Sequence, residues 1–189
     1  MASKVKICNL ALARIGVNPI TSLTDNTIEA RTCNILYEEI AKEVMTEGVF
    51  TSTINRAVLN KTTNTPAFGF TYEFQLPTDP KSLRVLAIDE ETTGDHDYRI
   101  EGDKLLANIS TMEIEYVGYL TDSGSYDEQL KKVIVAKLAA DLAYPLTGSA
   151  GISDRLYQRY LREFEDAKSV DGQNGSNQYV VSTDLTDIR

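Results

Sequence analysis

The sequence predicts an α+β protein whose two ends together form a four-helix bundle, with a small antiparallel β insertion between them and an extended C-terminal arm. Three observations support this prediction. Apolar residues recur at helical spacing near both ends of the chain, they alternate with polar residues in its middle third, and the chain becomes polar from residue 170. We therefore expect residues 1–50 and 125–169 to form the bundle, residues 51–124 the β insertion and residues 170–189 the arm.

The strongest helical signal lies between Asp25 and Glu47. Its apolar residues share one helix face, because their spacing is i, i+3, i+4, i+7, i+8 and i+11. They are Cys33, Leu36, Tyr37, Ile40, Ala41 and Val44. Asp25 or Thr27 can cap the start of the helix, and Gly48 can end it. Burying the larger side chains at about 1.5–3 kcal/mol each contributes roughly 10 kcal/mol before opposing terms, so we expect this face to lie in the core.

A first helix is expected to precede it, with Ser3 as its N-cap and Gly16 at its end. Its apolar stripe comprises Val5, Cys8, Leu12 and Ile15. Pro19 keeps the following segment irregular, and the linker over residues 17–24 is short. The first two helices are therefore expected to pack as an antiparallel hairpin.

The middle third has the period of strands. Alternating apolar side chains occur at Phe68, Phe70, Tyr72, Phe74 and Leu76. We expect this aromatic face to pack in a core rather than to stack on bases, because its surroundings are acidic. Further strands are expected at residues 83–88 and 112–116, with a hairpin at 98–105 that turns at Glu101-Gly102-Asp103. The segments 60–67 and 89–97 are expected to be projecting loops.

Helical spacing returns near Asp127 and is expected to end before Pro145. The apolar stripe of this third helix comprises Leu130, Val133, Ile134, Leu138, Ala139 and Leu142. Ser153 can cap a fourth helix. The apolar side of that helix comprises Leu156, Tyr157, Tyr160, Leu161 and Phe164. Neither helix pair alone covers its stripe, so the two pairs are expected to close one bundle.

Composition limits the possible partners. The formal net charge of −9 makes the chain as a whole a poor candidate for sequence-independent nucleic-acid binding, which depends on neutralising phosphates. Residues 1–24 nevertheless hold three basic residues and no acid, which indicates either a solvated helix face or contact with an acidic partner. No apolar run approaches the roughly 20 residues of a membrane span, and we expect synthesis in the cytoplasm. Cys8 and Cys33 are expected to be buried free thiols.

No catalytic motif is found. The chain has no glycine-rich phosphate loop, no H-E-x-x-H and no C-x-x-C. His96 lies between Asp95 and Asp97 in an expected loop, where exposure is the simpler interpretation. The candidate carboxylates are expected to be solvated, and they are Glu38, Glu39, Asp89, Glu90, Glu91, Glu113 and Glu115. We therefore predict no catalytic residue, no cofactor and no metal site, although a paired-carboxylate hydrolase stays an alternative.

The polar C-terminal segment contains one β-prone patch, Tyr179-Val180-Val181. One interpretation is a disordered tail. The alternative is an arm that orders on a partner, along a groove or a sheet edge. We select these three residues as candidate partner-binding residues.

Several motifs, taken in order, resemble phage head-to-tail adaptor proteins, including the tail tubular protein A family of short-tailed phages. The resemblance starts with the stretch from Ile7 to Gly16, ICNLALARIG, and the Pro19-Ile20 that follows it. It continues through Glu29-Ala30-Arg31, Tyr37, Arg56-Ala57-Val58-Leu59, Leu76-Pro77-Thr78-Asp79, the stretch from Leu142 to Gly148 and the stretch from Tyr157 to Ala167. Phe50 stands where the pattern has a tryptophan.

The resemblance implies a ring, commonly of twelve copies, at the head–tail junction of a virion. The helical bundle would build the ring wall, the arm with Tyr179, Val180 and Val181 would reach the portal protein, and the β unit would face the tail tube or nozzle protein. Twelve copies at −9 each would carry about −108, so DNA would pass without being held. Two alternatives stay open: a carboxylate hydrolase of cell-wall glycans, and a small intracellular adaptor outside any virion.

Overall fold

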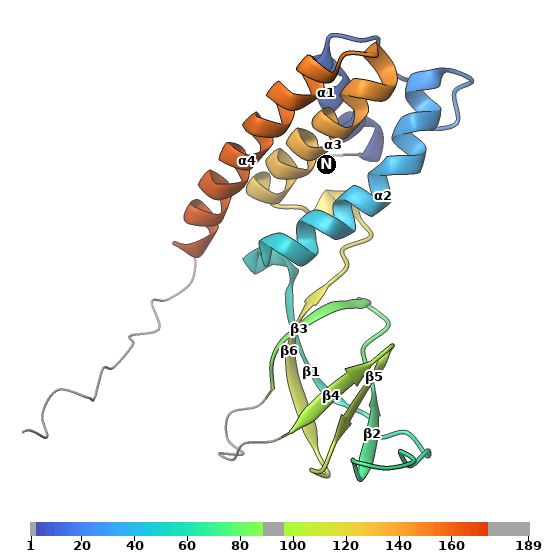
Figure 1. Ribbon diagram of the computed structural model, residues 1–189, viewed down its shortest axis with the longest axis vertical. Helices are drawn as coiled ribbons and strands as arrows, with labels where there is room; N and C mark the ends of the chain where they lie inside the picture. Colours follow the sequence, from blue (N-terminus) through green and yellow to red (C-terminus); the bar gives the residue numbers. More distant parts are fainter. Residues whose placement is uncertain (1–2, 89–96, 174–189) are drawn as a thin grey trace, which may run out of the picture.

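The computed structural model describes residues 3–88 and 97–173. Helices near the two ends of the chain form one unit, and the strands form a second unit below it (Figure 1). The helices are α1 (Lys4–Ile15), α2 (Ile28–Gly48), α3 (Glu128–Thr147) and α4 (Ala150–Gly172). The described strands are β1 (Ile54–Leu59), β2 (Tyr72–Gln75), β3 (Ser82–Ile88), β4 (Tyr98–Glu101), β5 (Lys104–Ala107) and β6 (Met112–Gly118). The α+β class is therefore confirmed.

The predicted four-helix bundle is wrong, because α3 is a central helix and the other three pack around it. In a four-helix bundle each helix turns one apolar stripe toward a shared axis. The four consecutive residues 133–136 of α3 are all buried, and at about 100° per residue they cover its whole circumference. A helix that is apolar all round needs neighbours on every side. For the same reason α1 and α2, which were expected to pair as a hairpin, both pack mainly on α3.

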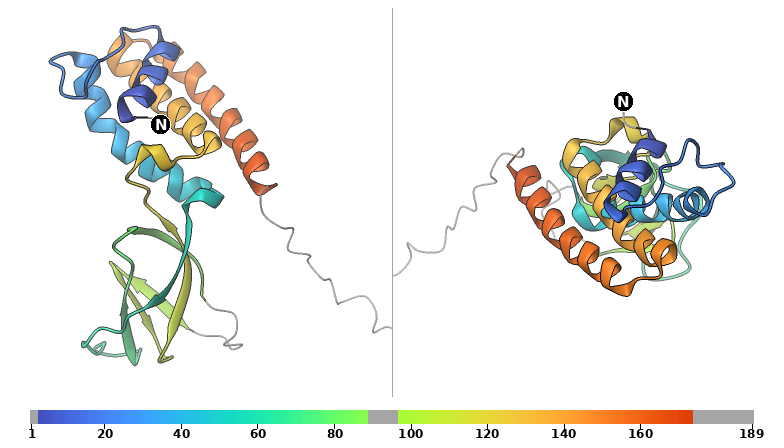
Figure 2. Two further views of the ribbon diagram at one scale, coloured as in Figure 1. Left: turned by 180° about the vertical axis from the view of Figure 1, so that it is seen from behind. Right: turned by 90° about the horizontal axis from the view of Figure 1, so that it is seen from above.

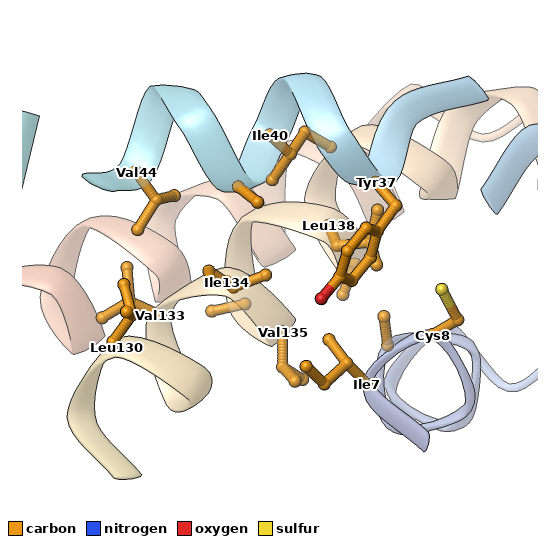
Figure 3. Close-up of a cluster of buried hydrophobic side chains, with 14 of the residues drawn as sticks. Ile7, Cys8, Tyr37, Ile40, Val44, Leu130, Val133, Ile134, Val135 and Leu138 are labelled. Atoms are coloured by element: carbon orange, nitrogen blue, oxygen red, sulfur yellow. The ribbon is translucent and has the colours of Figure 1, made fainter. Parts of the chain in front are cut away.

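The core of the helical unit lies where α1, α2 and α3 meet (Figure 3). Tyr37 of α2 points toward α3, which presents Ile134 and Leu138 on that side, and Ile40 of α2 belongs to the same core. On another side of α3, Val135 points toward Ile7 of α1. The apolar stripe predicted for α2 is thus buried, except that Leu36 is only partly covered.

Local signals at the helix ends were predicted with mixed success. Ser3 and Thr27 accept hydrogen bonds from the backbone N–H groups of Lys6 and Ala30, as N-caps do. Pro145, in contrast, lies inside α3, which ends at Gly148 with a left-handed φ of 69°. Ser153 does not cap α4, because α4 already begins at Ala150 and Ser153 lies inside it; the Ser153 hydroxyl donates to the Ala140 carbonyl of α3 at 3.1 Å.

The β unit consists of two antiparallel three-stranded sheets, with strand orders β1-β6-β3 and β2-β5-β4. The predicted hairpin is confirmed as β4 and β5, with Gly102 at a left-handed φ of 63° in the turn. The predicted aromatic strand is shorter than expected: Phe74 is buried in a second core, but Phe68 lies outside any strand and is 88% exposed. Gly69 follows Phe68 with a φ of 82°, a conformation that a strand does not accommodate.

The helical and β units are joined next to the end of α4. The Asp171 carboxylate, buried at 7% exposure, accepts hydrogen bonds from the backbone N–H and the hydroxyl of Thr51 at 2.8 and 2.9 Å. Residues 170–172, expected at the start of the arm, thus belong to α4 (Figure 2). Tyr179, Val180 and Val181 lie outside the described residues, as does His96. Among the described helices, none has both the length and the apolar character that a membrane span requires.

Candidate functional site

The helical unit has one face on which α3 reaches the solvent between α2 and α4 (Figure 1). Between residues 133 and 144, α3 is buried except at Lys137, Asp141 and Tyr144, which share one side at i, i+4 and i+7. We call this surface the open face. It comprises Glu43 and Glu47 of α2, Lys137, Asp141 and Tyr144 of α3, and Tyr157 and Leu161 of α4.

Lys137 lies at the centre of the open face. Its side chain is only 12% exposed, and its Nζ lies 3.1 Å from Glu43 Oε1 and 3.7 Å from Asp141 Oδ2. The same ammonium group lies 5.4 and 5.3 Å from the ring centroids of Tyr157 and Tyr160, which is cation–π distance. The ammonium group of Lys137 therefore links α2, α3 and α4 through its contacts with carboxylates and aromatic rings.

The electrostatics of Lys137 favour its charged form. Burial alone would lower the pKa of this lysine, but the hydrogen bond to Glu43 and the charges of Asp141 and Glu43 raise it above its usual value. A lysine that forms Schiff bases needs the opposite shift, because only the neutral amine attacks. Lys137 is thus a fixed cation that positions its neighbours.

Asp141 is a partly buried carboxylate of the open face. Burial raises the pKa of Asp141, and the charge of Glu43 adds to this rise, while Lys137 opposes it. Burial likewise raises the pKa of the Tyr160 hydroxyl, which lies 3.5 Å from Glu47 Oε2. Lys137 pairs with both Glu43 and Asp141. Because the open face holds three carboxylates and one lysine, its net charge is negative, and we interpret it as a recognition surface.

The open face also carries large exposed side chains. Tyr144 is 59% exposed, while Tyr157 and Leu161 are each about 40% exposed. Tyrosines surrounded by charged groups are typical of protein–protein interfaces, where they supply contact area at low entropic cost. The arrangement is therefore suited to binding a partner with basic and apolar groups.

Four of the predicted carboxylates lie within the described residues, and their observed partners are mostly basic side chains. Glu38 lies 3.0 Å from Lys4, and this hydrogen bond holds the pKa of Glu38 below its usual value. Glu39 pairs with Lys42, Glu115 pairs with Arg56, and Glu113 is exposed. Two of these acids lie on α2 and two on β6, whereas a glycosidase places its two carboxylates on either side of one bond.

Among the remaining predicted groups, the structure describes the two cysteines. Cys8 and Cys33 are buried free thiols, as predicted, and a hydrogen bond with Cys33, together with burial, raises the pKa of Cys8. Within residues 3–88 and 97–173, no three His, Cys, Asp or Glu side chains are grouped so that they could hold a metal ion. Residues 89–91 and His96 lie outside the described residues.

Sequence reasoning missed the importance of Lys137 and Asp141. A lysine and an aspartate at i and i+4 usually form a solvated pair on a helix surface. The available signal was their setting, because apart from Lys137 and Asp141 all of the positions from 133 to 143 hold apolar residues. Charged residues in such a helix must lie at its one open side.

A second polar group joins α1 to α4. The Glu163 carboxylate accepts hydrogen bonds from Arg14 at 3.0 Å and from Arg159 at 2.6 Å, and its side chain is 10% exposed. Burial alone would raise the pKa of Glu163, but the two arginines outweigh this effect and hold it below the ordinary value of 4.5. The pair Arg14–Glu163 connects residues 149 positions apart.

Changing Glu163 to glutamine is expected to destabilise the protein by about 2 kcal/mol at neutral pH, because hydrogen bonds to a charged, buried partner are lost. A lowered pKa means that this contribution is present above pH 4.5 and is lost as the pH falls through the native value. The difference in unfolding free energy between wild type and the Glu163→Gln variant, measured by urea unfolding, should therefore become smaller below pH 4.5. A difference that stays constant down to pH 3 would contradict the predicted ionisation.

A scan against protein-family models found no match to this chain, and a search of curated proteins found none either. Function is therefore inferred from the geometry of the described residues and from the motif resemblance.

Proposed function

We propose that this chain is a structural virion protein, a head-to-tail adaptor that forms a ring between the portal and the tail and lets DNA pass. One observation carries this proposal: the molecule is elongated (Figure 2), and large apolar side chains belonging to both its helical and its β unit are exposed. An adaptor needs separate surfaces for separate partners, and clustered exposed apolar side chains mark such surfaces.

At the helical end, exposed apolar residues occur on both flanks of α3. Ile28 and Ile35 lie on α2 at i and i+7, so they share the outer side of that helix. Tyr157 and Leu161 lie on α4 at i and i+4. A ring is built from one heterologous contact, which requires two different faces on each copy. The outer side of α2 and the exposed side chains of α4 lie on opposite flanks of α3, so the helical end has more than one apolar surface available to partners (Figure 1).

At the β end, the candidate surface for the tail tube or nozzle protein includes the edge strand β4 and the loop before β2. Tyr98 and Ile100 of β4 are both more than 40% exposed, and their i and i+2 positions place them on one side of the strand. Phe68 lies in the loop with its ring almost fully exposed. An aromatic ring presented in this way is suited to inserting into a partner.

The role of Tyr179, Val180 and Val181 at the portal is part of the same proposal. They follow α4, whose last turn is fixed by the bonds of Asp171 to Thr51. The ion pairs of Glu38, Glu39 and Glu115 favour a mechanical role over the glycan-hydrolase alternative. The proposed location is the head–tail junction of the virion, after synthesis in the host cytoplasm.

The test is to mix the purified chain with the portal ring of the same virion and to measure particle mass. The intact chain should join the portal ring in many copies. Deleting residues 174–189 should leave thermal stability unchanged but weaken portal binding at least tenfold, because the proposed contacts at Tyr179, Val180 and Val181 are removed. An intact chain that never joins the portal ring would overturn the proposal.

A longer deletion, of residues 170–189, provides the comparison. It also removes Asp171 and its two bonds to Thr51, so it should lower stability by about 2–3 kcal/mol. If the two deletions lost the same stability, the weaker portal binding of the shorter one would reflect misfolding instead of a missing contact.

A further inference from the structure

The helical unit has a second charged face, formed by α1 and α4. Arg155, Arg159 and Arg162 follow one side of α4 at i, i+4 and i+7, and Arg159 converges with Arg14 of α1 on the Glu163 carboxylate. Leu10, 43% exposed, precedes Arg14 by one helical turn. We call this surface the basic face, and it comprises Leu10, Arg14, Arg155, Arg159 and Arg162.

The basic face and the open face lie on opposite sides of α3. Val135 of α3 points toward Ile7 of α1 (Figure 3), and Val135 is about 200° around the helix from Lys137. The view from behind accordingly shows α1 in front of α3, whereas Figure 1 shows α3 in front (Figure 2). A contact between these two faces would therefore be front to back.

The charges of the two faces are complementary. The open face holds Glu43, Glu47 and Asp141 against the single cation Lys137. On the basic face, the four arginines outnumber their acidic neighbours Glu163 and Asp166. Among the described residues, neither Arg155 nor Arg162 forms an ion pair, and both are exposed. Opposite charges steer association and fix its orientation.

We propose that the open face of one copy binds the basic face of the next copy, so that copies associate front to back. This inference rests on the proposed ring and assigns the faces that form it. The arginines would lie over Tyr144 and Tyr157 and against the carboxylates, while Leu10 would meet Leu161. Each copy uses one face for each neighbour, which generates a ring when the rotation closes.

A second copy fits the basic face better than nucleic acid does. Two acids, Glu163 and Asp166, are interleaved with the arginines, and the whole chain carries −9. A phosphate-binding helix would be expected to lack such acids, because each one cancels part of the attraction. Of the three basic residues near the N-terminus, Arg14 belongs to the basic face, whereas Lys4 pairs with Glu38 of the same chain at 3.0 Å.

The test exchanges charges between the faces of the full chain. Variant A carries Arg155→Glu and Arg162→Glu, which makes both of its faces acidic. Variant B carries Glu43→Lys and Glu47→Lys, which makes both faces basic. Each variant alone should assemble roughly a hundredfold more weakly than wild type, by mass measurement over a concentration series, both free and on the portal ring. An equal mixture of A and B should assemble again, because A and B can alternate.

The control reverses Arg84 and Arg99 to glutamate, which changes the net charge as much as variant A does but lies in the β unit. This control should assemble like wild type. Because Glu43 contacts Lys137, a second form of variant B changes Glu47 alone. The melting temperature of each variant is compared with that of wild type, so that a loss of assembly is not caused by unfolding.

The assigned faces would be overturned if the mixture of A and B failed to assemble, or if the control assembled as weakly as variant A. In either case the adaptor proposal would still stand, provided that the wild-type chain binds the portal ring. Loss of duplex DNA binding in variant A, with assembly unchanged, would assign the arginines to nucleic acid and also overturn the inference. A wild-type chain that neither self-assembles nor joins the portal ring would overturn both proposals.

Discussion

Changing Ile40 to aspartate is expected to leave the chain unfolded at room temperature. Ile40 is 3% exposed and belongs to the buried core of the helical unit (Figure 3). Removing a buried isoleucine costs about 2–5 kcal/mol through lost burial and the cavity left behind. Placing a carboxylate there adds several kcal/mol, because no described group at that site can pair with it. Together these costs approach the roughly 5–15 kcal/mol that stabilise a typical domain.

The matched control is the same substitution at Ile35, five residues earlier on α2. Ile35 is 71% exposed, and it lies about 200° around the helix from both Cys33 and Tyr37. Its replacement should change the free energy of unfolding by no more than about 0.5 kcal/mol. Circular dichroism during urea unfolding distinguishes the two variants. A cooperative, wild-type-like transition for Ile40→Asp would show that this face of α2 is not in the core.

Changing Phe50 to alanine is expected to cost about 3–5 kcal/mol, the range for a large aromatic side chain removed from a core. Phe50 has no exposed surface and lies directly after α2, where the chain leaves for the β unit. Its ring meets Phe164 of α4 edge to face, with centroids 6.4 Å apart. It also covers Gly48, where an added Cβ would lie 2.2 Å from the ring. One side chain therefore connects α2, α4 and the start of the β unit.

Phe68→Ala provides the control for Phe50→Ala, since it removes the same ring from an exposed position. Its unfolding midpoint should match that of wild type, whereas the Phe50 variant should unfold at clearly lower urea concentration with a similar slope. Equal midpoints for the two variants would mean that Phe50 does not join the two units. If Phe68 contacts the tail as proposed, its variant should lose tail binding without losing stability.

Some of the fold could be predicted from sequence because its causes are local. The caps Ser3 and Thr27 bond to N–H groups three residues away, and the turn at Gly102 joins adjacent strands. Such interactions need no knowledge of distant segments. The apolar stripe of α2 is local in the same sense, since spacing alone places its residues on one face.

The misjudged elements depend on distant neighbours. Spacing selected one stripe on α3 and did not show that Val135 and Ala136 are buried as well. Burial on every side depends on how many helices surround α3, and the pattern within one helix does not contain that number. The end of the aromatic strand was misjudged similarly, because alternation continues through Phe68 although the chain has left the sheet.

The amino-acid sequence by itself determined the α+β class, the approximate positions of the helices, the tight hairpin turn and the buried state of the two cysteines. Those features follow from interactions within a few residues or from the pattern of apolar residues. Only the tertiary structure decided that α3 is central, that Lys137 meets Glu43, and that Arg14 meets Glu163. Charges far apart in the chain become partners only after packing has set which helix faces are left open, and the two faces proposed for assembly arise at that step.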